Sequence, residues 1–303
     1  MVTVLVTGAG GLLGSAFLRV APALRYRVVG VMTRHSDLCG QTEIVTADLS
    51  ERENVQRVMD QVRPAVVVHC AALTNVDFCE SHPEDADRLN ARMAGAIAEA
   101  AQEQGARLIH VSTDAVFDGR RGGYGEADTT NPLSVYAQSK WKGEGLVGTA
   151  CPTALVLRTS IFGWNVADRV SLAEWFFNSL QGGQRIKGFT DIIFSPLLTD
   201  HFCVAALALL EKRASGVFHL GSRDACNKYE FGLSLARAFG LQESLIEPCE
   251  SDSIPGRAPR AKNTTLNCAK AQSILGRPLP SVAEGLMEFK AQKGMGDRVR
   301  TEA

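Results

Sequence analysis

The chain has 303 residues, 45% of them hydrophobic, and its formal net charge is −1 with charges of both signs mixed along it. That length supports a large core, either in one big domain or in a main domain with a smaller lobe. The charge balance provides no basic field for nucleic acid, and no apolar run reaches the roughly 20 residues that span a membrane.

The cysteines and histidines argue against a disulfide framework and against a metal site. Eight cysteines are scattered without a Cys-x-x-Cys pair, and none of the six histidines has a metal-ligand spacing such as His-Glu-x-x-His. The N-terminus lacks the basic start and apolar middle of a secretory signal. We therefore expect a reduced, cytoplasmic protein without a metal, and we interpret the acidic pair Glu80 and Asp85 as a solvated face rather than a Mg²⁺ site.

Strand and helix patterns alternate through the first half of the chain. A near-continuous apolar strand at 2–6 leads into a glycine-rich turn and a helix at 12–24. Further strands are expected at 26–32, 43–47, 65–70 and 107–112, and further helices at 54–61 and 83–104. This alternation predicts an α/β protein with a Rossmann-type, doubly wound parallel sheet.

The second half mixes the last elements of that sheet with a smaller unit. Helices are expected at 136–146, 171–180, 202–210, 229–239 and 268–275, and strands at 154–158, 185–189 and 216–220. We predict a dinucleotide-binding domain at 1–162 with returning elements near 190–222. A C-terminal substrate-binding lobe is expected mainly at 163–290, followed by a polar, flexible tail at 291–303.

The glycine-rich turn has the spacing and the context of a dinucleotide-binding loop. It reads Thr7-Gly8-Ala9-Gly10-Gly11-Leu12-Leu13-Gly14 and joins a strand to a helix. Gly8 permits the tight turn, Gly11 lets the backbone approach a pyrophosphate, and Gly14 lets the helix pack closely on the sheet. The N–H groups at the helix start, including those of Leu12 and Leu13, face the phosphates.

The end of the second strand indicates which dinucleotide binds. An NAD site usually has an acid there for the ribose hydroxyls, whereas this chain has Thr33 and Arg34. Arg34 is suited to a 2′-phosphate, so we expect NADP(H). Asp48 and Leu49 follow the third strand where the adenine would lie. The small residues Cys70, Ala71 and Ala72 end the fourth strand and would let the cofactor approach the backbone.

Tyr136 and Lys140 are the candidate catalytic pair. Residues four apart share one face of a helix, and an ammonium close to a phenol should lower the phenol pKa from roughly 10. Such a phenol can exchange a proton near neutral pH. Alone, Tyr-x-x-x-Lys is common by chance. Its weight comes from the glycine turn and from Val111-Ser112-Thr113-Asp114, which ends an apolar run upstream.

Together these segments resemble an extended short-chain dehydrogenase/reductase, and most closely the dTDP-4-dehydrorhamnose reductase group. The similarity covers almost the whole chain, and its strength lies in the order and spacing of its parts. Those parts are 7–14, 69–77, 90–91, 112–119, Tyr124, Glu126, 131–136, 139–140, 143–144, 158–160, 216–220, 229–231 and 257–260.

The resemblance implies a role for each matching residue. Tyr136 would protonate a carbonyl oxygen, Thr113 would hydrogen-bond that oxygen, and Lys140 would hold the ribose. Asn90 and Ser112 would belong to the cofactor site, and Asn90 would also support the geometry of the active-site helix. The substrate would be a nucleotide sugar bound by Asp114, Ser160, Arg257 and Arg260. The two arginines would bind its diphosphate. A homodimer is the candidate assembly.

Two positions depart from the resembling reductases, and they leave alternatives open. Those enzymes usually have Tyr after Ser-Thr-Asp and Trp after Arg-Thr-Ser, where this chain has Ala115 and Ile161. The first hypothesis is an NADPH-dependent reductase of a keto group on a nucleotide-linked deoxysugar. The second is a non-catalytic, NADP-binding regulatory subunit resembling the methionine adenosyltransferase β subunit. A sugar-nucleotide epimerase or dehydratase is a third. A dehydratase would need a pair of acids beside the catalytic Thr, whereas this chain has only Asp114, followed by Ala115.

Overall fold

A parallel sheet forms the centre of the computed structural model, which describes residues 1–34, 42–166, 169–253, 256 and 258–293. Its path in space runs β10 (Gly216–Leu220), β6 (Leu155–Phe162), β5 (Arg107–Thr113), β4 (Val66–His69), β1 (Thr3–Thr7), β2 (Arg27–Met32) and β3 (Glu43–Thr46). Every pairing along this path is parallel, and β9 (Pro196–Leu198) extends the sheet beside β6. The strand order reverses at β1, as in Rossmann sheets, which confirms the predicted fold class.

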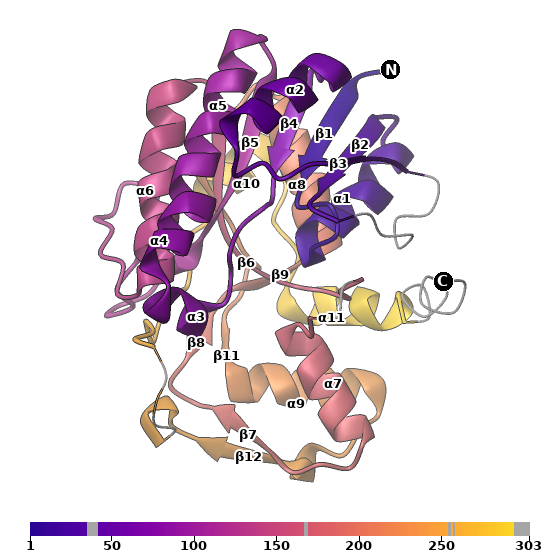
Figure 1. Ribbon diagram of the computed structural model, residues 1–303. Helices are drawn as coiled ribbons and strands as arrows, with labels where there is room; N and C mark the ends of the chain where they lie inside the picture. The colour runs from indigo at the N-terminus through magenta and orange to yellow at the C-terminus, as the bar shows by residue number, and fades with distance from the viewer. Residues whose placement is uncertain (35–41, 167–168, 254–255, 257, 294–303) are drawn as a thin grey trace.

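Helices cover both faces of this sheet (Figure 1). One face packs against α1 (Leu12–Ala23), α8 (Thr199–Glu211) and α10 (Ala269–Leu275). The other packs against α2 (Arg52–Val62), α5 (Met93–Glu103) and α6 (Val135–Ala150). The strands are buried on both sides, which explains why their sequences are nearly continuous runs of Val, Ile and Leu.

A third apolar core lies at the lower end of the molecule (Figure 1). It joins α7 (Leu172–Gln181), α9 (Lys228–Phe239) and α11 (Val282–Ala291), and its centre is a group of buried phenylalanines that includes Phe162, Phe176, Phe231 and Phe289. Two small sheets complete it, β7 (Ile186–Phe189) with β12 (Ile246–Cys249) and β8 (Ile193–Phe194) with β11 (Cys226–Asn227). The domain boundaries stay predictions.

The helix expected at 83–104 is divided in the structure. It comprises α4 (Pro83–Ala86), a π-helical stretch at Asp87–Arg92, and α5. The π-helical stretch lies against α6, where a Cβ added to Gly143 would come 2.4 Å from the carbonyl oxygen of Asn90. The short helix α3 (Val76–Ser81), just before α4, was not predicted.

The C-terminal end is more ordered than the sequence indicated. Helix α11 follows the helix that we expected to be the last one, and a capping box between Ser281 and Glu284 begins it. The Ser-x-x-Glu spacing was the signal that could have revealed it. Gln292 is buried and donates to Asp200 (3.0 Å), so the expected tail does not start at 291. Across the part of the chain that is described, no helix is long and apolar enough to cross a membrane.

Candidate active site

A cavity of about 790 Å³ opens at the carboxyl ends of the central strands, where open α/β sheets bind ligands. It gathers residues from the ends of β1, β2, β4, β5 and β6 and from α6. Most of the predicted site residues line it, namely Gly8, Gly11, Leu12, Leu13, Arg34, Asp48, Leu49, Cys70, Ala71, Ala72, Ser112, Thr113, Asp114, Tyr136, Lys140 and Ser160.

The glycine turn is shaped by close backbone contacts. Gly8 has a φ of +65°, and a Cβ there would lie 2.7 Å from the Cα of Ala71. A Cβ on Gly14 would lie 2.1 Å from the carbonyl oxygen of Gly8. Gly11 is the N-cap of α1 and provides no side-chain cap, so the first N–H groups of the helix remain available at the cavity wall. These features fit a bound pyrophosphate.

The start of α6 is held in place by two acceptors. Ser134 caps the helix by accepting from the N–H of Ala137 (3.2 Å), and Glu80 accepts from the N–H of Val135 (2.8 Å). Glu80 is thus a partner of α6, and Asp85 pairs with Arg88 (2.9 Å). Because the helix begins at Val135, Tyr136 and Lys140 lie one turn apart on the face that borders the cavity.

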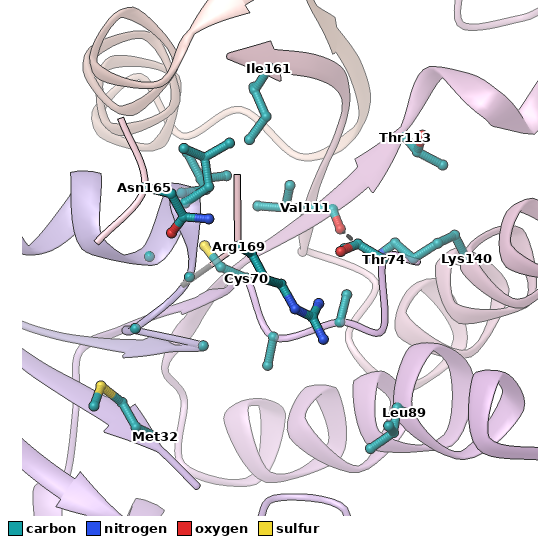
Figure 2. A pocket seen from close by; sticks show the side chains of 18 of the residues that line it. Met32, Cys70, Thr74, Leu89, Val111, Thr113, Lys140, Ile161, Asn165 and Arg169 are labelled. Atoms are coloured by element: carbon teal, nitrogen blue, oxygen red, sulfur yellow. Dashed lines mark hydrogen bonds between the residues drawn. The ribbon is translucent and has the colours of Figure 1, made fainter. Parts of the chain in front are cut away.

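Lys140 is buried, and its ammonium donates to the carbonyl oxygen of Val111 at 2.7 Å (Figure 2). Burial lowers its pKa to about 8, while the negative charge of Glu144 opposes that decrease. The ammonium is therefore directed at β5, the strand that ends in Thr113.

The phenol of Tyr136 is held in its protonated form. Burial raises its pKa to about 12, the nearby charge of Asp114 also raises it, and a hydrogen bond with Thr113 opposes the change. The expectation that Lys140 lowers this pKa is wrong for the protein without cofactor, because desolvation of the phenolate dominates. A protonated phenol is a proton donor.

Thr113 and Asp114 form the end of the cavity next to this phenol. The Thr113 hydroxyl donates to Asp114 Oδ1 (3.2 Å), and the other carboxylate oxygen of Asp114 accepts from Thr264 (2.6 Å). Burial raises the pKa of Asp114. Thr264 comes from the segment after β12, so the C-terminal part of the chain helps to orient the carboxylate.

Two predicted site residues lie elsewhere, and a third is not described. Asn90 is absent from the cavity wall: its amide accepts from Leu73 N (2.8 Å) and donates to Leu73 O (3.0 Å) and to Ser139 (3.0 Å), so it braces α6 instead of facing a cofactor. Arg260 pairs with Asp77 of α3 (2.8 Å), also away from the cavity wall. Arg257 lies outside the described residues.

The loop after β6 contributes cavity residues that the sequence did not reveal. Asn165, Arg169 and Ser171 line the cavity, and Figure 2 shows the Arg169 guanidinium reaching into it. The pattern of residues loosens after Gly163, so no periodicity marked these positions. Ile161, one of the two departures noted in the sequence, also lines the cavity. Ala115, the other, belongs to the short 3-10 helix Asp114–Val116, whose first residue lines the cavity.

A Rossmann sheet with a glycine turn, a strand-end Thr and a helical Tyr-x-x-x-Lys defines the class of extended short-chain dehydrogenases/reductases. Within that class the chain belongs to the family described as RmlD substrate binding domain, which matches residues 2–294. This agrees with the resemblance found in the sequence.

Individual relatives match over nearly the full length. The chain is 32% identical to the "Probable low-salt glycan biosynthesis reductase Agl14" of Haloferax volcanii, covering 94% of this chain and 96% of that protein. It is also 32% identical to methionine adenosyltransferase 2 subunit beta of Danio rerio, covering 92% and 86%. Among solved structures, dTDP-4-dehydrorhamnose reductase of Bacillus anthracis in complex with NADP superposes with a TM-score of 0.86, at 26% identity, covering 96% of this chain and all of that one.

Proposed function

We propose that the protein is an NADPH-dependent reductase of a keto group on a nucleotide-linked deoxysugar. The observation that carries the proposal is that Thr113, Tyr136 and Lys140 line one cavity together with the glycine turn at Gly8–Gly14. A reductase needs a proton donor at the carbonyl oxygen, and the phenol of Tyr136 carries a proton near neutral pH. The reductase relative and the NADP-bound structural neighbour support the same class.

The cofactor site is built from the chain's own backbone and cations. The turn at Gly8–Gly14 and the open N-terminus of α1 would hold the pyrophosphate. Arg34 would bind the 2′-phosphate, Arg169 would add a second positive charge, and Lys140 would hold the ribose. When bound, the cofactor supplies the hydride.

The residues at the end of the cavity divide the remaining work. Tyr136 gives its proton to the carbonyl oxygen as negative charge develops there. The Thr113 hydroxyl, which donates to Asp114 in the absence of substrate, would donate to the same oxygen and stabilise it. Lys140 keeps a positive charge beside the site, which favours the phenolate that remains after proton transfer.

The alternatives receive less support. A regulatory subunit like the methionine adenosyltransferase relative has no need for the complete set Thr113, Tyr136 and Lys140 in one cavity. A dehydratase would use a second acid beside Asp114, where Ala115 stands. The cytoplasmic location, the homodimer and the particular sugar stay predictions.

The test is a screen of the purified protein with NADPH against keto-sugar nucleotides and simple ketones and aldehydes, followed by the loss of NADPH absorbance. On the best substrate, Tyr136→Phe should lower turnover by about 10²–10⁴-fold and leave NADPH affinity nearly unchanged. Tyr26→Phe is the matched control. It removes a phenol hydroxyl that donates to Glu211 at 2.8 Å, and neither residue lines the cavity. Full turnover by Tyr136→Phe would contradict the proposal.

A further inference from the structure

A buried ion pair joins α6 to β6 close to Lys140. Glu144, one turn beyond Lys140, accepts from Arg158 Nε at 2.9 and 3.2 Å and from Nη2 at 2.7 Å. The two side chains are only 7% and 6% exposed. The contact is bidentate, the strongest geometry for a guanidinium and a carboxylate.

This pair connects the three elements that carry the site. Glu144 belongs to α6, Arg158 to β6, and Ser112 at the end of β5 donates to Glu144 at 2.5 Å. Ser112 precedes Thr113, and Arg158 precedes the cavity residues Thr159 and Ser160. The Glu144 carboxylate therefore binds the residue that precedes Thr113 on β5 and the residue that precedes Thr159 on β6.

Stability alone is a weak reason for such a pair, because the desolvation of two buried charges offsets most of their attraction. Lys140 supplies another reason. Its ammonium is buried, and the partner it contacts is the neutral carbonyl oxygen of Val111. It forms no ion pair within the described residues, so the charge of Glu144, four residues along the same face, is its principal electrostatic support.

Four other titratable groups around Lys140 carry no charge near neutral pH. From β4, His69 has its pKa lowered by burial to about 3, and Cys70 just after it has its pKa raised by burial to about 12. From β5, burial lowers the pKa of His110 well below its usual value, and on α6 the pKa of Tyr136 is about 12. Between about pH 6 and 10, Lys140 is the group among them that changes charge.

We propose that the Glu144–Arg158 pair is a positioning element that keeps Lys140 protonated at working pH and fixes α6 against β5 and β6. The inference deepens the proposed reductase function, on which it rests. Glu144 supplies the negative charge, and Arg158 and Ser112 hold that charge in a single place. Neither member of the ion pair lines the cavity, so the pair acts through Lys140 rather than on the substrate.

The test compares the alkaline limb of the pH profile of kcat/KM in three variants. Glu144→Gln removes the supporting charge and leaves Arg158 unpaired, so the limb should move to lower pH by about one unit or more. Glu144→Met/Arg158→Met removes both charges, and its limb should fall between that of Glu144→Gln and that of the parent protein. Val147→Ala is the matched control: it opens a cavity in the same helix without changing a charge, so its Tm should fall while its limb stays in place.

A limb that stays at the parental pH in Glu144→Gln, with a Tm loss like that of Val147→Ala, would show that the pair is merely structural. If Glu144→Gln does not fold, the double variant carries the test, because it leaves no buried charge unpaired. A limb at the parental pH there would equally overturn the proposal.

A second measurement separates this inference from the proposed function. The Lys140 titration can be followed by NMR of ¹³C-labelled lysine side chains, with the signal assigned from Lys140→Arg. The Lys140 pKa should be lowest in Glu144→Gln, intermediate in the double variant and highest in the parent protein. This order is expected whether or not the protein turns over a substrate. A parent protein that reduces no keto substrate but shows this order would refute the reductase function and leave the role of the pair intact. An unchanged Lys140 titration in Glu144→Gln would refute the pair's role by itself.

Discussion

The Lys140 ammonium lies 2.7 Å from the carbonyl oxygen of Val111, so the catalytic helix is joined to the strand that ends in Thr113. Its charge does not determine the protonation of Tyr136, which burial dominates. In the proposed reaction, the phenol is the acid, and the ammonium, whose pKa burial lowers to about 8, is the group that titrates near neutral pH.

This difference predicts the pH dependence of the reduction. Lys140 must be protonated, and its pKa is lowered to about 8, so kcat/KM should be highest below that pH and fall as the pH rises through it. Tyr136, with a pKa of about 12, should not contribute to this limb. The measurement is kcat/KM for the best keto substrate between about pH 6 and 10, a range that includes the expected decrease, at constant ionic strength. A rate that stays constant across this range would contradict the assignment of Lys140.

Arg34 should determine the choice between the two nicotinamide dinucleotides. NADPH should bind more tightly than NADH, and the difference should shrink with added salt because Arg34 is exposed. Arg34→Asp should reverse the order by placing an acid beside the ribose hydroxyls. Equilibrium binding at low and high salt measures both effects. Equal affinity of the parent protein for the two cofactors at low salt would show that this interpretation is wrong.

Arg169 should affect both cofactors alike. Its guanidinium reaches into the cavity, where it would meet a phosphate that NADPH and NADH share. Arg169→Met should therefore weaken the binding of both by a similar factor, about 10–150-fold for the loss of one charge-assisted hydrogen bond. Arg185→Met is the control, since Arg185 is exposed and pairs with Glu247 in the C-terminal lobe (3.2 Å). A loss confined to NADPH would instead place Arg169 at the 2′-phosphate.

Ala115 should limit the use of the family's usual sugar. The resembling reductases have a phenol at this position, which directly follows Asp114, and its absence leaves room and removes a hydrogen-bond donor. We expect weak or no turnover of dTDP-4-dehydrorhamnose by the native protein and a gain in Ala115→Tyr. The gain should be larger when Ile161 on the cavity wall is also changed to Trp. Native turnover of this sugar at kcat/KM of roughly 10⁴ M⁻¹s⁻¹ or more would refute the idea.

Two glycines of α6 should respond in opposite ways to the same substitution. A Cβ on Gly143 would lie 2.4 Å from the Asn90 carbonyl oxygen, whereas one on Gly145 would meet open space. Gly143→Ala should lower the free energy of unfolding by about 1–3 kcal/mol and displace the catalytic helix. Gly145→Ala should raise it by about 0.5–1 kcal/mol, because Ala is the better helix former. Chemical denaturation of both variants decides the point, and an equally stable Gly143→Ala would mean that the helix approaches Asn90 less closely.

The sequence alone determined the fold class and most of the cavity. Apolar strands and helices alternate in patterns that depend on neighbouring residues, so the parallel sheet and the glycine turn after β1 were predictable. The spacing of four between Tyr136 and Lys140 predicted a shared helix face. The resemblance to the reductases implied that Thr113 at the end of β5 would act beside them, and all three residues line one cavity.

Only the tertiary structure decided how these residues are charged and what surrounds them. The raised pKa of Tyr136 depends on desolvation in the folded protein, which no local pattern reports. Arg169 reaches the cavity from a loop without periodicity, and Arg260 meets Asp77 across 183 residues. The Glu144–Arg158 pair exists because α6 packs beside β6. Local propensity follows from a few consecutive residues, whereas desolvation and charge pairing follow from packing between distant ones.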